Sequence, residues 1–381
     1  MLYRNFPKIP GLSVSALGFG CMRLPVVDGD ESRIDVPAAD AVLEAALEAG
    51  VNYVDTAWPY HREGSERWLG QTLERLEARD RVLLATKSPS WLVKERGDWR
   101  RFLDEQLARL RTDHVDFYLI HALDGERWKT VLATGGLEEL AAARAAGLVR
   151  HVGFSFHDSL DAFKTIIDGW DGWEFCQVQY NYLDDEIQAG TAGIEFADAR
   201  GIGTIIMEPL RGGALAAVPD EVKAMFAGYG VPRMPAEWAL RFAWDRQEVV
   251  TVLSGMNSVG QVWENAAVAS SARPNMITRV ERDILRSARD FFLARTAVPC
   301  TTCGYCMPCP SGVVIPGVFE LWNSATMFGR SERNAGWYRN AFMSKARGGD
   351  SCTNCGACVS KCPQGIDIPA MMPKAHADLT S

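Results

Sequence analysis

Two hydrophobic periods alternate along the first 270 residues of the chain. Short runs that are apolar on both faces are typical of buried parallel strands, and they cover residues 16–19, 51–55, 82–86, 115–121, 149–155, 175–179, 203–207 and 250–254. Apolar residues at helical spacing predict helices over residues 39–49, 66–76, 100–110, 137–146, 160–168, 190–199, 236–245 and 259–270. Eight strand-then-helix units within about 250 residues predict an α/β fold, a closed (β/α)8 TIM barrel.

An open, doubly wound sheet is the alternative for the same order of elements. It is disfavoured because no G-x-G-x-x-G sequence follows the first strand, where such a sheet would bind a dinucleotide. In a closed barrel, residues just past the carboxyl ends of the strands form the active site. The candidate catalytic residues are therefore expected at those strand ends.

Composition and charge narrow the class of protein. The chain has 381 residues, 40 basic against 48 acidic side chains, a formal net charge of −8 and 47% hydrophobic residues, as in an ordinary globular protein. The negative charge predicts no nucleic-acid partner and no attraction to anionic membranes. No apolar run approaches the roughly 18 residues that cross a bilayer, and residues 1–10 lack the apolar stretch of a signal peptide. We therefore expect no membrane partner and a cytoplasmic location.

Cysteines are distributed unevenly along the chain. Only Cys21 and Cys176 lie in the first 299 residues, and both are expected to be buried as small apolar side chains. The other eight cysteines lie between residues 300 and 362, which indicates a second segment with different chemistry. We expect one domain over residues 1–295 and another over residues 296–381.

Four titratable side chains fall at three consecutive strand ends: Asp55, Tyr60, Lys87 and His121. A tyrosine has an ordinary pKa of about 10, and a nearby ammonium lowers that pKa by stabilising the phenolate. A carboxylate beside the lysine would hold the ammonium in place. A tyrosine tuned in this way can donate a proton to a carbonyl oxygen as hydride reaches the carbon, while a histidine orients the substrate. Each residue alone could be structural, but their joint placement indicates catalysis.

The segments around these residues resemble the catalytic segments of the aldo-keto reductases. The similarity lies in VDTAWPY at 54–60, ATKS at 85–88 and YLIH at 118–121, and it extends over about residues 3–295 in the order of that family. The resemblance implies a (β/α)8 barrel that binds NADP or NAD in an extended form, without a Rossmann motif. It also implies that Tyr60 is the general acid.

The resemblance further implies that Lys87 and Asp55 tune this acid and that His121 orients the carbonyl. Met207 stands where the family often stacks a tyrosine on the nicotinamide, and the neutral Gln261 stands where many members place an arginine near the 2′-phosphate. The preference between NADPH and NADH therefore stays open. The cofactor-binding positions implied by the resemblance are Ser155, Gln177, Met207, Pro209, Leu210, Gly212, Gly255, Gln261, Glu264 and Asn265.

Three tryptophans, Trp58, Trp91 and Trp128, are expected in loops at the mouth of the barrel. Flat aromatic rings there could stack on sugar faces or on aromatic substrates, or could simply pack the loops. They do not identify a substrate.

Cysteines of the tail form two runs. The run over residues 352–363 has the bacterial ferredoxin spacing C-x2-C-x2-C-x3-C-P, and the run over residues 300–310 is C-x2-C-x2-C-x2-C-P. Such closely spaced thiolates wrap 4Fe-4S clusters, and in two-cluster ferredoxins the fourth cysteine of each run serves the other cluster. That rule assigns one cluster to Cys300, Cys303, Cys306 and Cys362, and a second cluster to Cys352, Cys355, Cys358 and Cys309.

Two zinc sites with four cysteines each are the alternative for this tail. Zinc ribbons usually show two separated pairs of cysteines, whereas three cysteines at successive x2 gaps with a closing Cys-Pro favour clusters. The tail resembles a di-cluster ferredoxin module, a small and mainly α-helical ferredoxin-like domain. Helices are expected over residues 319–328 and 337–346, between the two runs.

The leading hypothesis is an NAD(P)H-dependent oxidoreductase of the aldo-keto reductase type that carries two 4Fe-4S clusters and acts on a small-molecule carbonyl or alcohol. Because a hydride carries two electrons and a 4Fe-4S cluster passes one, the clusters could be structural, could exchange electrons with a ferredoxin or flavoprotein, or could act on the substrate. The alternative is an electron-transfer or partner-docking module whose barrel is not a nicotinamide reductase. The intact set of four strand-end residues favours the enzyme.

Overall fold

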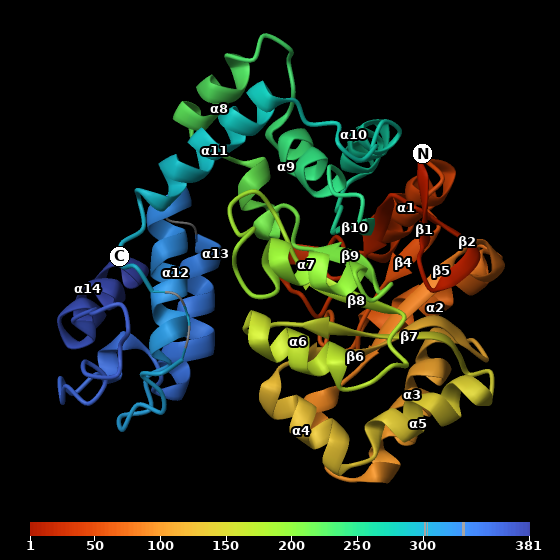
Figure 1. The fold of residues 1–381 in the computed structure, drawn as a ribbon, viewed down its shortest axis with the longest axis horizontal. Coiled ribbons are helices and arrows are strands. Elements are labelled where there is room, and N and C mark those ends of the chain that lie inside the picture. The colour runs from red at the N-terminus through yellow and green to blue at the C-terminus, as the bar shows by residue number, and fades with distance from the viewer. Residues whose placement is uncertain (301, 303, 330–331) are drawn as a thin grey trace. The chain divides into compact units, whose positions relative to one another are not determined.

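A computed structural model describes residues 1–300, 302, 304–329 and 332–381, without the side chain of residue 333. The chain divides into two compact units (Figure 1), of which the first comprises Met1–Ala216 and Arg233–Arg279 and the second Ala217–Pro232 and Val280–Ser381. The domain division expected at residue 295 is inferred from where the cysteines cluster, not from how the chain packs. It stays a prediction.

Within the described residues, the first unit contains eight parallel strands that close into a barrel, as the hydrophobic periods predict. The strands follow one another in chain order, and β10 closes the barrel by pairing with β3 and β9. Every expected strand is confirmed to within two residues at each end. The strands are β3 (Leu17–Gly20), β4 (Tyr53–Asp55), β5 (Leu83–Ser88), β6 (Val115–Leu123), β7 (Val149–Phe156), β8 (Phe175–Gln179), β9 (Gly203–Met207) and β10 (Val249–Ser254).

Helices connect the strands and cover the outside of the barrel (Figure 1). The helix expected at residues 100–110 begins earlier because Glu95 and Asp98 form a capping box at its start. An additional helix, capped by Asp124, was not expected. The helices of this unit are α1 (Val36–Glu48), α2 (Ser65–Arg75), α3 (Arg96–Leu110), α4 (Gly125–Ala133), α5 (Gly136–Ala145), α6 (Leu160–Asp168), α7 (Gly190–Asp198), α9 (Pro235–Trp244) and α10 (Val259–Ala269).

A β-hairpin that the sequence analysis did not anticipate covers one end of the barrel. Its strands, β1 (Tyr3–Phe6) and β2 (Ile9–Ser15), pair antiparallel. Phe6 packs against Phe117 and Phe175, with 5.2 and 6.0 Å between ring centroids. Since Phe175 is the first residue of β8, the hairpin covers the amino ends of the strands. The carboxyl ends, where a site is expected, lie at the other end.

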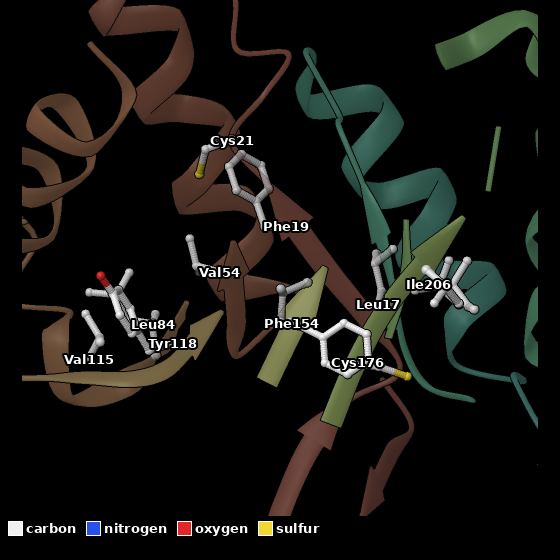
Figure 2. Packing of buried hydrophobic residues seen from close by; sticks show 14 of the residues in the cluster. Leu17, Phe19, Cys21, Val54, Leu84, Val115, Tyr118, Phe154, Cys176 and Ile206 are labelled. Atoms are coloured by element: carbon white, nitrogen blue, oxygen red, sulfur yellow. The ribbon is translucent and has the colours of Figure 1, made fainter. Parts of the chain in front are cut away.

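Successive residues of a barrel strand pack in opposite directions. In β6, Phe117 and Leu119 belong to the cluster inside the barrel, whereas Tyr118 belongs to the layer between strands and helices. Figure 2 shows side chains of this outer layer, including Cys21 and Cys176. Both cysteines are buried free thiols, as expected. The strands are thus apolar on both faces, which is the pattern that predicted them.

The second unit is mainly helical. The helix expected at residues 319–328 is confirmed and begins earlier, with Pro316 in its first turn. The helix expected at residues 337–346 is confirmed in part: a short α-helix ends at Trp337, a π-helical turn and a 3-10 turn continue to Lys345, and Ala346 takes a left-handed conformation. The helices of the unit are α8 (Asp220–Ala227), α11 (Arg279–Leu293), α12 (Ile315–Phe328), α13 (Glu332–Trp337) and α14 (Ile368–Thr380).

Helices α12 and α14 pack together and form the core of the second unit. Val318, Phe319 and Met372 are buried in this core. The indole of Trp322 donates to Asp378 at 2.8 Å and ties the two helices together. Across the described ranges, no helix is both long enough and apolar enough to span a membrane.

Candidate active site and cluster site

Lys87, near the carboxyl end of β5, is the centre of the site at the barrel mouth. Its ammonium donates to Asp55 Oδ2 at 2.6 Å, to the carbonyl of Thr56 at 2.9 Å and to the hydroxyl of Tyr60 at 3.3 Å. An ammonium has three donors, so all three are used. The side chain is fully buried, as is Asp55 at the end of β4. Three of the four expected catalytic residues therefore lie in contact.

A tight turn after β4 carries Tyr60. His61, Arg62 and Glu63 all adopt positive φ angles, of 52°, 49° and 70°, which residues other than glycine rarely adopt. The His61 ring secures the turn because Nε2 accepts from the backbone N–H of Leu24 at 3.2 Å and Nδ1 lies 3.0 Å from the carbonyl of Glu31. The unusual backbone of this loop thus has a defined anchor beside the candidate acid.

His121, in the last part of β6, is the fourth expected residue. Its ring centroid lies 6.1 Å from that of Tyr60 and 5.2 Å from that of Trp91, edge to face in both cases. Its Nδ1 is buried and has no hydrogen-bond partner among the described residues. The backbone carbonyl of His121 accepts from Ser90 Oγ at 2.6 Å, which fixes the strand end. An imidazole nitrogen is therefore available to a ligand beside the tyrosine.

Burial and charge shift the pKa of each of these groups. Burial raises the pKa of Tyr60 above its ordinary value, and Lys87 opposes that rise without cancelling it, so the expected net lowering of this pKa is wrong. Burial also raises the pKa of Asp55. For Lys87, burial lowers the pKa, but Asp55 and Tyr60 raise it more. Burial, and then Lys87, hold the pKa of His121 well below its ordinary value. The arrangement is a protonated phenol, a charged ammonium and a neutral imidazole.

The tryptophans expected at the mouth separate into two kinds. Trp91 is 41% exposed, whereas Trp58 and Trp128 are each 6% exposed. Trp58 packs edge to face on Phe102, and Trp128 lies in α4 against Trp173. Only Trp91 is therefore placed to meet a substrate beside His121.

Three of the expected cofactor positions lie on adjacent strands. Gln177 in β8 donates its side-chain amide to the sulfur of Met207, the last residue of β9, at 3.6 Å. The Gln177 Oε1 atom is buried and has no hydrogen-bond partner among the described residues. Ser155 in β7 accepts from the backbone N–H of Ala122 at 2.7 Å. A buried amide oxygen that lacks a donor fits the carboxamide of a nicotinamide, which can supply one.

The remaining cofactor positions lie after β9 and β10. Asn265 donates to Ser254 Oγ at 3.2 Å, and Gln261 Oε1 accepts from the backbone N–H of Asn257 at 3.0 Å. Gly212 has a φ of 68°. Glu264 is exposed, Pro209 is buried, and Leu210 and Gly255 are half-buried. Their contacts with a dinucleotide stay predictions.

The tail cysteines line two separate cavities of the second unit. Cys300, Cys306 and Cys362 line one cavity, with an empty volume of about 320 Å³ that is partly open to solvent. The other, of about 330 Å³, is lined by Cys309, Cys352, Cys355 and Cys358. Cys303 lies outside the described residues. The two sets match the crossed ligand assignment.

Ile315 and Ile368 contribute to the walls of both cavities. No three His, Cys, Asp or Glu side chains within the described ranges are grouped closely enough to hold a single metal ion. Each set of described cysteines therefore lines one hollow of the second unit.

A buried polar network behind the site was not anticipated. Glu66 in α2 and Gln106 in α3 are both fully buried and hydrogen-bonded to each other at 2.6 Å. A signal for it exists in the sequence, because Glu66 shares a helix face with Leu69 and Leu73 at spacings of three and seven. A polar residue within an apolar stripe predicts a buried polar contact.

Family models match both parts of the chain. One described as the aldo/keto reductase family matches residues 16–281, and one described as a 4Fe-4S dicluster domain matches residues 299–366. An L-galactose dehydrogenase from Arabidopsis thaliana is 29% identical over 282 residues, covering 68% of this chain and 86% of that protein. A 6-dehydroglucose reductase from Novosphingobium aromaticivorans is 30% identical over 251 residues, covering 60% and 78%.

Solved structures agree with the fold. An aldo-keto reductase from Klebsiella pneumoniae in complex with NADPH aligns with a TM-score of 0.59 at 22% identity, over 75% of this chain and 95% of that one. At this identity the likeness supports the barrel alone, whereas the family model spans well over half of the sequence. The chain therefore belongs to the aldo/keto reductase family and carries a C-terminal 4Fe-4S dicluster domain.

Proposed function

We propose that the barrel is an NAD(P)H-dependent oxidoreductase that interconverts a small-molecule carbonyl and its alcohol, with Tyr60 as the general acid. One observation carries the proposal: the buried Lys87 ammonium contacts both Asp55 and the Tyr60 hydroxyl. Family membership and the NADPH complex of a structural neighbour support the cofactor class.

The bound nicotinamide would supply the hydride that reduces the carbonyl carbon. Tyr60 donates its hydroxyl proton to the carbonyl oxygen, so that the C=O double bond becomes a C–O–H group. Lys87 stabilises the phenolate left behind, and Asp55 holds Lys87 in place. The neutral His121 directs an imidazole nitrogen to the substrate and orients it. A raised Tyr60 pKa keeps the proton available at neutral pH.

Gln177, Met207 and Ser155 would hold the nicotinamide, through the free amide oxygen of Gln177 and the thioether of Met207. The other positions implied by family resemblance would contact the rest of the dinucleotide. Gln261 brings no positive charge to a 2′-phosphate, so the preference between NADH and NADPH stays open. Sugar-derived carbonyls are the first substrates to test, because two relatives are named for sugars and Trp91 lies exposed beside His121.

Tyr60→Phe tests the central role. Loss of a general acid lowers the turnover number by about 10²- to 10⁴-fold, while NADPH binding, measured by fluorescence titration, is retained. The matched control is Tyr53→Phe, which removes a hydroxyl from the same strand and loop region, at the amino end of β4. Full turnover by Tyr60→Phe, or an equal loss in both variants, would remove Tyr60 as the acid.

For the tail, we propose two 4Fe-4S clusters with crossed ligands. Thiolates at ferredoxin spacing are the donors that such clusters use, and the two cavities divide the described cysteines as the crossed rule requires. The clusters would each pass one electron, to or from a ferredoxin or flavoprotein partner. Because these thiols have to stay reduced before assembly, we place the protein in the cytoplasm.

Paired substitutions test the crossed ligands. Cys309→Ser combined with Cys355→Ser should remove about half of the bound iron and sulfide, because both residues serve one cluster. Cys309→Ser combined with Cys306→Ser should remove nearly all of it. The opposite result would mean that each run binds its own cluster. If NADPH alone bleached the wild-type clusters, electrons would pass from the nicotinamide to the clusters within this protein. That result would contradict the need for a ferredoxin or flavoprotein partner.

A further inference from the structure

Glu66 lies in the first turn of α2 and has no exposed surface. Its carboxylate accepts from Thr86 Oγ1 at 2.6 Å, from Gln106 Nε2 at 2.6 Å and from Arg109 at 3.3 Å. These donors come from β5 and α3. A buried carboxylate is costly unless it is paired and hydrogen-bonded, and here each oxygen has a donor. Glu66 therefore joins three elements behind the barrel-mouth site.

One arm of this network reaches Lys87. Gln106 Nε2, held by Glu66, also donates to the backbone carbonyl of Lys87 at 3.0 Å. The hydroxyl of Tyr118 donates to Gln106 Oε1 at 2.9 Å, so the amide is secured from both sides. Thr86, the other donor to Glu66, immediately precedes Lys87. The backbone that carries the ammonium is thus fixed at two consecutive residues.

The second arm reaches the loop that carries Tyr60. The guanidinium of Arg109 pairs with Glu66 and lies 3.6 Å from the ring centroid of Trp58. Trp58 is buried against Phe102 and stands two residues before Tyr60. Arg109 itself is 5% exposed, so its stacking face is shielded from water. Glu66 therefore contacts the supports of both the ammonium and the phenol.

The contact between Lys87 and Tyr60 is the one most sensitive to these supports. It measures 3.3 Å, against 2.6 Å to Asp55 and 2.9 Å to the Thr56 carbonyl. Since the ammonium has no spare donor, a shift of a few tenths of an ångström at either support lengthens the weakest of the three bonds first.

We propose that Glu66 is a positioning residue that sets the separation of Lys87 and Tyr60, through Gln106 and Thr86 on one side and through Arg109 and Trp58 on the other. The proposal rests on the function proposed above. It adds that the carboxylate of α2, which touches neither substrate nor cofactor, controls how well the phenolate is stabilised when the proton leaves.

Each arm can be cut separately. Gln106→Met keeps the length of the side chain and removes its bonds to Glu66 and to the Lys87 carbonyl. Glu66→Gln keeps an oxygen for Thr86 and Gln106 and turns the Arg109 pair into an unfavourable contact between donors. The matched control is Glu74→Gln, the same change on the same helix at a residue that is 62% exposed and pairs with Arg111 outside the network.

The first readout is kinetic. With NADPH and 4-nitrobenzaldehyde as probes, Gln106→Met and Glu66→Gln should each lower kcat about tenfold or more, because small misplacements at a reacting centre have large effects. The Kd of NADPH should stay within about twofold, since the change is confined to the chemical step. The deuterium isotope effect on kcat should rise. Glu74→Gln should match the wild type in all three.

The second readout does not need activity. Crystal structures of the wild type, of Gln106→Met and of Glu66→Gln should show the Lys87–Tyr60 separation growing beyond hydrogen-bond distance in both variants. An unchanged separation together with unchanged kcat, even with a lower melting temperature, would make the network merely structural and overturn the proposal. If the wild type turned over no carbonyl, the proposed function would fail, and the crystallographic comparison would still decide the role of Glu66.

Discussion

Replacing Lys87 with methionine removes the buried ammonium and leaves the Asp55 carboxylate buried without its partner. Asp55 loses the ammonium at 2.6 Å and stays 2% exposed, with no other cation in its described contacts. Removing one partner of a buried pair costs about 3–5 kcal/mol of unfolding free energy. The loss depends on pH, because Asp55 can escape it by protonation. In the variant the folded state raises the carboxyl pKa above the unfolded value of about 3.9, so stability falls as pH rises past that value.

The same substitution should slow the chemistry by a separate route. At the observed 3.3 Å and an effective dielectric constant of about 20, an ammonium and a phenolate attract by about 5 kcal/mol. Asp55 offsets part of this attraction, so 5 kcal/mol is an upper bound. At about 1.36 kcal/mol for each factor of ten, the rate of the chemical step should fall by about 10²-fold to at most about 5 × 10³-fold.

A second substitution separates the two effects. Lys87→Met with Asp55→Asn leaves neither member of this pair charged, so most of the lost stability should return while the rate stays low. Urea unfolding followed by circular dichroism measures the first quantity, and single-turnover nicotinamide absorbance measures the second. A single variant whose rate stays within tenfold of the wild type, or a double variant that recovers its rate, would refute the electrostatic role of Lys87.

Other outcomes follow from the same geometry. Gly70→Ala should destabilise the chain by about 1–3 kcal/mol in urea unfolding, because its methyl group would lie 2.6 Å from the backbone carbonyl of Arg109, whereas Gly97→Ala meets nothing within 4 Å and should be neutral or stabilising. Because the pKa of His121 is lower in the folded chain than the unfolded value of about 6.5, stability should fall as pH drops below 6.5, and His121→Gln should reduce that fall in unfolding curves at acid and neutral pH. Gln261→Arg should favour NADPH over NADH by about tenfold in fluorescence titrations, through a charged contact with the 2′-phosphate, and an unchanged ratio would place that phosphate elsewhere.

Much of the barrel could be predicted because its strands are apolar on both faces and short. The run at 175–179 and the run at 203–207 coincide with β8 and β9. The N-terminal hairpin could not be predicted, since it is held by contacts of Phe6, Ile9 and Val14 with interior residues that are distant in sequence. The turns after Trp337 end at Ala346, which takes a left-handed conformation that the sequence does not indicate for an alanine.

For the site, motif spacing was enough to bring Asp55, Tyr60 and Lys87 together. Motif spacing did not predict the direction of the Tyr60 pKa shift. That direction depends on whether burial raises the pKa more than the Lys87 ammonium lowers it. Nor could motif spacing supply Glu66, whose partners Gln106 and Arg109 are some forty residues away in sequence. These long-range polar contacts form because α2 packs on α3. The hydrophobic pattern alone does not predict how the two helices are oriented relative to each other.

In the proposed reaction, hydride passes directly to a carbonyl carbon at the barrel mouth, and the clusters take no part in this transfer. Its most direct test uses NADPH carrying deuterium at the transferred position, with the alcohol product analysed by mass spectrometry. Direct transfer predicts one deuterium at the carbinol carbon, in protein with or without its clusters. Product that carries only solvent hydrogen at that carbon would contradict the account, because electrons delivered singly are followed by protons from water.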